Sequence, residues 1–324
     1  MKKYYSLILF FCLGYSINFN AQSILPATPD SNLDRIFALE FFGLSPNIID
    51  FNSISNYHFF NPYAFNPAMA GIENKRQLNF DWNRQVNHSA SISYEQPLAN
   101  INSAIGIQYE YSDKYYGKIH RYGVAYNYGF RWKENSQLRI GAQFSQVNIK
   151  MNKYSYFPLE KDKWYSFPSV DFGLVFQHKQ LRLGASVQNL FPKKYAIFNE
   201  VTESYVNKVG TERTLNFTAA NTFKLSEKWD WSLAFLLRFS RSEIINDFDY
   251  FYEYRNNDRH DFSSYFSFKK KLTIGTTYRT QYDPIWIGFV GVKLKEKLNL
   301  QFSFNVKKDS YEPRFWETLA QYQF

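Results

Sequence analysis

The amino-acid sequence predicts an all-β fold, a transmembrane antiparallel β-barrel of about fourteen strands. Three observations predict it. Polar and apolar residues alternate from about residue 76 onward, the alternating segments are about ten residues long, and no segment after the N-terminal leader approaches 18 consecutive apolar residues. Successive side chains of a strand point to opposite faces, so alternation gives one apolar face and one polar face. Strands of ~9–11 residues suit a bilayer, whereas soluble strands usually have about five or six.

The segment 121–132 shows the alternation most clearly. One face carries Tyr122, Val124, Tyr126, Tyr128, Phe130 and Trp132, and the other carries Arg121, Gly123, Ala125, Asn127, Gly129 and Arg131. A soluble β-sandwich also alternates, so this pattern alone does not separate the two classes. Tryptophans near the ends of alternating segments favour the bilayer, because membrane barrels carry aromatic girdles there. They are Trp82, Trp132, Trp164, Trp229 and Trp286.

The lengths of the connections test this interpretation. Strands are predicted at 76–84, 88–96, 102–112, 119–132, 137–149, 167–178, 180–190, 212–223, 229–241, 261–269, 272–281, 285–294, 298–307 and 313–324. Three long connections, around 150–166, 191–211 and 242–260, follow the fifth, seventh and ninth strands and therefore emerge at one end. Outer-membrane barrels have long outer loops and short periplasmic turns, so both termini are expected to be periplasmic.

The N-terminus predicts export. Lys2 and Lys3 precede an uncharged apolar stretch from Tyr4 to Phe19, so residues 1–21 are expected to be a signal peptide. A membrane anchor is the alternative, but a spanning helix needs ~20 mostly apolar residues. Residues 22–56 form an N-terminal extension that is expected to plug the lumen, to lie in the periplasm or to stay loosely ordered. Residues 57–324 are expected to form the barrel in the cell outer membrane.

Composition excludes several kinds of chemistry. The single cysteine, Cys12, lies in the predicted signal peptide, which excludes disulfides, cysteine nucleophiles and cysteine zinc sites from the mature chain. The formal charge of +9 does not indicate nucleic acid as a partner, because the chain is exported. No HExxH, G-x-S-x-G or P-loop pattern occurs, so we predict no enzyme, no cofactor and no metal.

Other groupings of charged residues could suggest a functional site, but each also has a purely structural explanation. Asp258, His260 and Asp261 would suit a hydrolase only if they met in space, and a solvated loop is the simpler interpretation. Asp247, Asp249, Glu253 and Asp258 lack the spacing and glycine of a calcium loop. Four arginines at lumen-facing positions, which would make a cationic interior unless they bond to other lumen side chains, are Arg121, Arg131, Arg139 and Arg182.

One motif carries a family resemblance. Residues 57–71 read YHFFNPYAFNPAMAG. The stretch resembles the N-terminal signature of PorP/SprF proteins, in which an aromatic-rich segment precedes Asn-Pro-Ala-aromatic-Ala-Gly, with Met69 here at the aromatic position. From the residues alone the two Asn-Pro pairs mark tight turns that start the barrel, or alternatively a docking site for a partner. The matching residues are Asn61, Pro62, Asn66, Pro67, Ala68 and Gly71.

Two further regions extend the resemblance over residues 57–324. Residues 170–190, VDFGLVFQHKQLRLGASVQNL, are similar to the central hairpin of the family, and residues 289–324 are similar in layout to its last three strands. Phe315-Trp316-Glu317 stands where the family has a His-Glu pair, and the extension at 22–56 is a second departure.

The resemblance implies a role. PorP/SprF proteins are non-enzymatic outer-membrane components of type IX secretion and gliding, so the expected partners are outer-membrane lipid and a secreted adhesin, other type IX cargo or a periplasmic machine component. Aromatic loop residues suit protein recognition. The candidates for partner binding are Tyr154, Tyr156, Phe157, Trp164, Tyr250, Phe251 and Tyr252. A fatty-acid-transporter-like barrel that takes up a small hydrophobic or anionic ligand is the alternative.

Overall fold

The computed structural model describes most of the chain from residue 58 to residue 324. The described ranges are 58–84, 88–98, 101–114, 117–133, 135–151, 163–199, 204–211, 213–243, 254–256, 258–280, 285–306 and 316–324. The chain divides into two compact units, Met1–Ser45 and Pro46–Phe324, and all described residues belong to the second. The expected signal peptide and the extension 22–56 therefore lie outside the described residues.

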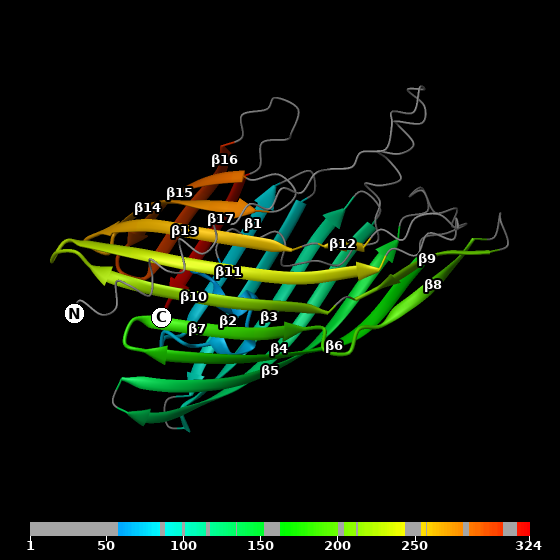
Figure 1. Ribbon diagram of the computed structural model, residues 1–324, viewed down its shortest axis with the longest axis horizontal. Helices are drawn as coiled ribbons and strands as arrows, with labels where there is room; N and C mark the ends of the chain where they lie inside the picture. The colour runs from blue at the N-terminus through cyan, green and yellow to red at the C-terminus, as the bar shows by residue number, and fades with distance from the viewer. Residues whose placement is uncertain are drawn as a thin grey trace. The chain divides into compact units, whose positions relative to one another are not determined.

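Seventeen strands occur in the described ranges, and fourteen of them make a single wall (Figure 1). The wall strands are β1 (Gln77–Arg84), β2 (His88–Leu98), β3 (Ser103–Lys114), β4 (Gly117–Lys133), β5 (Ser136–Met151), β6 (Lys163–His178), β7 (Leu181–Gln188), β10 (Thr214–Lys224), β11 (Trp229–Glu243), β13 (Arg259–Phe268), β14 (Leu272–Thr280), β15 (Ile285–Leu294), β16 (Leu298–Val306) and β17 (Trp316–Gln323). These match the fourteen predicted segments one to one.

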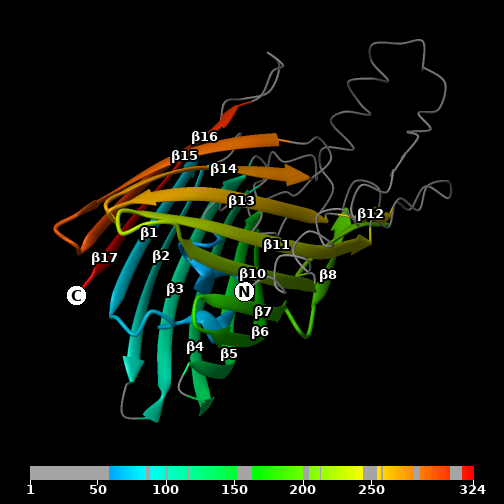
Figure 2. The same cartoon turned by 60° about the vertical axis from the view of Figure 1, so that its left-hand side comes forward.

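The wall is a closed antiparallel barrel. Each strand pairs with the next one in chain order, β7 pairs with β10, and β11 pairs with both β10 and β13. The pairing of β1 with β17, from Gln77 opposite Gln323 to Arg84 opposite Trp316, closes the ring (Figure 2). Closure satisfies the backbone groups of every wall strand, which is the condition for a sheet to cross a bilayer.

The long connections all leave one end of the barrel. They follow β5, β7, β11 and β16, and span 152–162, 189–213, 244–258 and 307–315. Two of them carry short strands that the sequence did not predict, the hairpin β8 (Lys194–Asn199) with β9 (Ser204–Gly210), and β12 (Tyr254–Asn256), which pairs with the end of β11. We call this end of the barrel the long-loop end. The opposite, short-turn end carries the tight turns and the C-terminal residue Phe324.

The two faces of the wall differ as the alternation predicts. Side chains such as Tyr122, Val124 and Phe144 face outward and are about half exposed, whereas Arg121, Asn127 and Gln143 face the lumen and are buried. Paired aromatic rings gather near both ends of the outward face, for example Trp82 with Trp316 and Trp229 with Phe268. This arrangement matches an apolar belt between two aromatic girdles. Among the helices of the described ranges, none is long and apolar enough to cross a membrane.

Candidate functional site

The segment 58–74, which carries the signature motif, lies inside the barrel instead of leading directly into the first strand (Figure 2). It forms two 3-10 turns, η2 (Pro62–Ala64) and η3 (Pro67–Met69), each with proline in the first turn after an asparagine N-cap. A proline there has no N–H to leave unpaired, so each Asn-Pro pair starts a turn. We call residues 58–74 the plug.

Asn66 fixes the plug to the central hairpin of the wall. Its side-chain oxygen accepts a hydrogen bond from the Ala68 N–H at 2.9 Å, which caps η3. Its amide nitrogen donates to the carbonyl oxygens of Leu174 on β6 and Ala185 on β7, at 3.1 and 3.2 Å. All the polar atoms of this buried amide therefore have partners, and the two family-like motifs of the sequence meet here.

Glycines open the wall where the plug touches it. A Cβ atom at Gly141 on β5 would lie 2.5 Å from the Ala68 nitrogen, and one at Gly106 on β3 would lie 2.5 Å from the Tyr63 ring. A Cβ atom at Gly173 on β6 would overlap the Asn66 side-chain oxygen. Three strands of the wall thus lack side chains where the backbone or the side chains of the plug approach, which makes a seat for it.

Polar lumen side chains bind the backbone of the plug. Asn127 donates to the carbonyl oxygens of Pro67 and Ala70, at 3.2 and 2.9 Å, and Arg139 donates to Ala70 at 3.1 Å. On the other side of the lumen, Ser186 and Asn216 both donate to the Phe65 carbonyl oxygen, at 2.6 and 3.4 Å. Gln321 on the last strand donates to the Phe60 carbonyl at 3.1 Å. These contacts tie the plug to strands on opposite sides of the barrel.

Gly71 lies near the end of the plug and has a conformation that favours glycine. Its φ is +64°, and a Cβ atom there would lie 2.7 Å from that of Ala104. Its N–H donates to a buried carboxylate oxygen of Glu95 at 2.6 Å. The chain then turns into β1. All six signature residues are therefore part of the plug or of its exit.

Aromatic residues hold the other end of the plug. Phe59 stacks on Tyr265 of β13, with ring centroids 4.8 Å apart, and lies 5.3 Å from Phe289 of β15. Phe60 joins this cluster. His58, the first described residue, is buried with its Nδ1 atom 3.8 Å from Asp261. Burial lowers the pKa of His58 from 6.5 to about 3, although the Asp261 charge opposes the shift.

The lumen charges compensate one another. Arg121 pairs with Asp171 through a short contact and lies 3.8 Å from Glu110. Asp261 accepts hydrogen bonds from Arg259 and Arg279. Arg139 binds Asn127 as well as the plug. Of the two interiors that the sequence allowed, these pairs favour the one in which arginines bond to other lumen side chains over a cationic lumen.

The remaining two arginines of the predicted set lie elsewhere. Arg182 pairs with Glu73 at 2.5 Å, and Arg131 is exposed near the short-turn end.

The three residues of the weak hydrolase grouping do not converge. His260 and Asp261 are consecutive on β13 and face opposite sides of the wall, and both oxygens of Asp261 are occupied by arginine donors. In the part of the chain that the structure describes, no group of three or more His, Cys, Asp or Glu side chains is arranged to hold a metal ion.

Strands β4 to β6 extend further than their neighbours and reverse their polarity. Near the long-loop end, their lumen face carries buried apolar side chains, namely Ile119, Val147, Ile149, Tyr165 and Phe167. Cross-strand pairing joins Ile119 to Ile149 and Val147 to Phe167. Their outer face there is polar, and Ser166 bonds to Gln146 and Asn148 at 2.6 and 2.7 Å. We call this part the upper wall.

Of the seven residues expected to bind a partner, the structure describes one. Trp164 was predicted in a loop, but it lies on β6, because 163–168 pairs with 146–151 and lengthens both strands. Its ring faces outward, 56% exposed, with its centroid 5.8 Å from that of His120. Tyr154, Tyr156, Phe157, Tyr250, Phe251 and Tyr252 lie outside the described residues.

Residues 51–322 match the family model of the type IX secretion system membrane protein PorP/SprF. The chain belongs to this family. The match contains the signature, the central hairpin and nearly all of the closing strands. A search of the curated proteins found no match.

Solved structures with a similar fold are outer-membrane barrels. A FadL homologue of Pseudomonas aeruginosa has a TM-score of 0.50 at 10% identity, with 81% of this chain and 94% of that chain covered. The toluene transporter TodX of Pseudomonas putida has a TM-score of 0.48 at 9% identity, covering 84% and 95%. The Acinetobacter baumannii protein Omp33 has a TM-score of 0.44 at 11% identity, covering 77% and 98%. At such identities the likeness concerns the fold alone.

Proposed function

We propose that this PorP/SprF protein is a non-enzymatic outer-membrane platform that supports type IX secretion or gliding by binding a protein partner. In this proposal the long-loop end faces outward and binds a secreted surface protein, and both termini are periplasmic, where a machine component would dock. Family membership supports the secretion role. The long connections at one end and short turns at the other support the orientation.

The plug is the observation that carries this proposal. A barrel that conducts or imports a ligand needs a path through the lumen, and here the signature segment is bonded to strands on opposite sides of it. A lumen filled in this way suits binding at the two ends better than passage through the middle. Asn66 of the plug and Gly173 of its seat lie in the two regions that resemble the signature and the central hairpin of the family.

Affinity purification from detergent-extracted outer membranes tests the proposal. We expect the full-length protein to retain a secreted protein or a periplasmic component in stoichiometric amount. Alanine substitution of the loop aromatics should release an outer partner. Alanine substitution of two exposed lysines in a turn at the opposite, short-turn end, Lys269 and Lys270, is the control and should leave the outer partner bound. The loop substitutions are Tyr154→Ala, Tyr156→Ala and Phe157→Ala in one variant, and Tyr250→Ala, Phe251→Ala and Tyr252→Ala in a second.

Trp164 serves as a separate probe, because it faces outward beside His120 instead of toward the barrel axis. If Trp164→Ala weakens partner binding as strongly as the loop variants do, the partner reaches down the outer surface of the barrel. Purification of a lone barrel with a bound small hydrophobic ligand would contradict the platform and favour the fatty-acid-transporter-like alternative.

A further inference from the structure

Basic residues gather on one half of the short-turn end. Four connections lie at neighbouring strands there, one before β1 and three that join β10 to β11, β13 to β14 and β15 to β16 (Figure 2). They contain eight basic and three acidic residues, and they are residues 73–76, 225–228, 269–271 and 295–297. The three connections of the other half contain one basic and one acidic residue, and they are residues 99–102, 134–135 and 179–180. We call the first four connections, together with Lys293 near the end of β15, the basic rim.

Hydrogen bonds of the backbone join the turns of the basic rim. The Lys269 N–H donates to the Lys228 carbonyl oxygen at 2.6 Å, and the Lys293 N–H donates to the Lys271 carbonyl oxygen at 2.7 Å. Lysines of successive turns are therefore neighbours in space, and they form one continuous basic surface across the ends of β11, β13, β14 and β15.

Two ammonium groups of the basic rim meet on the inner side of the barrel mouth. The Nζ atoms of Lys75 and Lys293 both donate to the Oε1 atom of Gln323, each at 3.4 Å. Gln323 is opposite Gln77, which is buried toward the lumen. The amide is neutral, so it satisfies hydrogen bonds without compensating either charge. Lys270 adds to the repulsion that Lys293 experiences from Lys75.

The acidic residues of the basic rim offset only part of its charge. Glu73 and Glu296 both attract Lys293, but Glu73 is also paired with Arg182 of β7 at 2.5 Å. Glu296 is exposed between two lysines of the β15–β16 turn. In the described ranges, no ion pair includes a lysine of the basic rim. The surface therefore keeps a positive balance that carboxylates of a partner can compensate.

Two turns of the basic rim place lysine where the backbone favours other residues. Lys269 and Lys270 have φ values of +48° and +55°, and Lys295 and Glu296 have +48° and +57°. A two-residue hairpin turn with positive φ at both positions favours Asn-Gly, because most residues with a Cβ atom are strained there. The turns thus hold charged side chains at a cost in backbone energy, which indicates a role for the charges beyond the turn itself.

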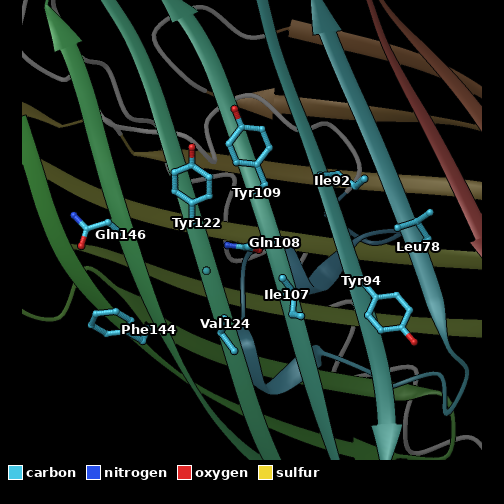
Figure 3. A pocket seen from close by; sticks show the side chains of 11 residues that line it. Leu78, Ile92, Tyr94, Ile107, Gln108, Tyr109, Tyr122, Val124, Phe144 and Gln146 are labelled. Carbon is cyan, nitrogen blue, oxygen red and sulfur yellow. The ribbon is translucent and has the colours of Figure 1, made fainter. Parts of the chain in front are cut away.

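Phospholipid head groups do not account for a charge confined to one side. On the outward face of β1 to β5, an apolar groove of about 470 Å³ is followed toward the short-turn end by neutral polar groups (Figure 3). There the Tyr94 hydroxyl donates to the Oε1 atom of Gln96 at 2.9 Å. Lipid surrounds the whole barrel, so head-group binding predicts lysines on every side. A protein that covers half of the mouth also reaches Lys75 and Lys293 on the inner side.

We propose that the basic rim is the docking surface for an acidic periplasmic protein, whose carboxylates bind Lys269, Lys270 and the pair Lys75 and Lys293. The proposal rests on the orientation and the periplasmic docking given under the proposed function. It adds which half of the mouth is contacted and the charge of the partner surface. Because the plug fills the lumen, the partner meets a closed mouth and a charged edge.

Binding of a fluorescein-labelled poly-glutamate peptide to the full-length protein in neutral detergent, followed by fluorescence anisotropy, tests this surface. Lys269→Asn/Lys270→Asn removes two charges, and asparagine suits positive φ. We expect roughly fivefold weaker peptide binding, because each exposed ion pair contributes modestly. Resistance to urea should equal or exceed that of wild type, which a purely structural role for these lysines would not give.

The matched control is Arg131→Asn/Lys179→Asn, which removes two exposed charges near the other half of the short-turn end. Lys179 also has a positive φ, +53°, so the backbone change is comparable. This variant should bind the peptide like wild type. Mobility on gels before and after heating verifies that each variant is folded.

Equal peptide affinity in all folded variants, or equal weakening in the control, would overturn the docking surface. Bilayer discs with equal amounts of phosphatidylglycerol and phosphatidylcholine test the lipid instead. Unchanged peptide binding together with loss of selective phosphatidylglycerol retention in Lys269→Asn/Lys270→Asn would assign the lysines to lipid and also overturn the proposal.

Affinity purification separates this proposal from the platform function. Lys269→Asn/Lys270→Asn should lose a periplasmic component and retain a secreted one. If it retains the periplasmic component as wild type does, the basic rim is not the docking surface, but the platform function stands. If wild type retains no protein partner, the platform function fails, and the peptide measurement still decides whether the basic rim binds acidic chains.

Discussion

Strands β4 to β6 meet opposite surroundings in their two halves. In the half around the plug, their lumen face carries Asn127, Arg139 and Asp171, and their outer face carries Tyr126 and Phe172. In the upper wall the same lumen face is apolar and the outer face is polar. Each strand continues through this change without a break in its pairing. The strand register stays the same, while the lumen face changes from polar to apolar and the outer face from apolar to polar.

The comparison shows where the membrane belt ends on this side of the barrel. An outer face facing acyl chains must be apolar, whereas one facing water can carry hydrogen-bonded polar groups such as Asn148 and Ser166. The lumen face changes in the opposite sense, from polar around the plug to apolar in the upper wall. Around the plug it supplies hydrogen bonds to a backbone without its own pairing partners, and in the upper wall it buries Ile149 and Phe167 as a soluble core does.

The largest effect on the half of the barrel around the plug is expected from a substitution that fills the seat of the plug. Gly173→Ala places a methyl group on the Asn66 side-chain oxygen, and three hydrogen bonds to Ala68, Leu174 and Ala185 hold that side chain in place. We expect the plug to leave its seat, so that a lumen closed in wild type conducts ions in planar bilayers and 58–74 becomes open to protease.

Gly123→Ala is the matched control for this change. It also adds a methyl group to the lumen face, but its nearest neighbours are side chains at 3.0 Å that can move, and none belongs to the plug. If Gly123→Ala conducted ions and Gly173→Ala did not, the inference that Gly173 makes room for the plug would be refuted.

The upper wall is tested by removing an apolar side chain from its lumen face. Phe167 is fully buried, so Phe167→Ala should lower the free energy of unfolding by about 3 kcal/mol. Ser166→Ala, one residue away on the polar outer face, should change it by less than about 0.5 kcal/mol. Urea titration followed by tryptophan fluorescence measures both. Equal losses of unfolding free energy in the two variants would contradict the inference that the lumen face of the upper wall is its buried, apolar face.

A smaller effect is expected from the amide that anchors the plug. Asn66→Ala removes three hydrogen bonds, two to the Leu174 and Ala185 carbonyl oxygens and one from the Ala68 N–H, so we expect a loss of about 2 kcal/mol in unfolding free energy. Asn148→Ala on the outer face should cost much less, because water replaces its bond to Ser166. The same urea titration compares the two asparagines, and a larger loss for Asn148→Ala would contradict the anchoring role of Asn66.

The wall could be predicted from the sequence because period-2 alternation is imposed locally. Strand β4, for instance, alternates without interruption from Tyr122 to Phe130, and the lengths of the connections then give the two ends. The upper wall was not predicted. Alternation through Val147 and Ile149 has the same period as alternation below, and period alone does not reveal which face meets lipid. For this reason Trp164 was expected in a loop.

The plug was missed for a different physical reason. Residues 58–74 have no periodicity, and their burial depends on side chains such as Asn127, Arg139 and Ser186 that are distant in the sequence. The Asn-Pro turns were predicted correctly, but their place in the lumen was not. One signal was present in the sequence. Glycines 141, 173 and 184 fall on lumen-facing positions of three consecutive strands, where a wall without a close neighbour would have no need of them.

His58 offers the smallest and most selective test, because it lies where the plug meets the charged part of the lumen. Burial lowers its pKa from 6.5 to about 3 against the attraction of Asp261, and Arg259 and Arg279 add to the lowering. The docked plug therefore keeps His58 neutral, while an undocked or unfolded chain takes up a proton as the pH falls below 6.5.

It follows that docking is fully stable above pH 6.5 and weakens progressively below it. Between pH 7.5 and 5.5 the loss should be about 1 kcal/mol, measured by urea titration at the two pH values. Other groups also titrate, so the relevant quantity is the difference from His58→Gln, which should lose this part of the pH dependence. His120→Gln, on the outer face, should retain it. If His58→Gln and wild type respond identically to acid, the histidine does not couple the plug to pH.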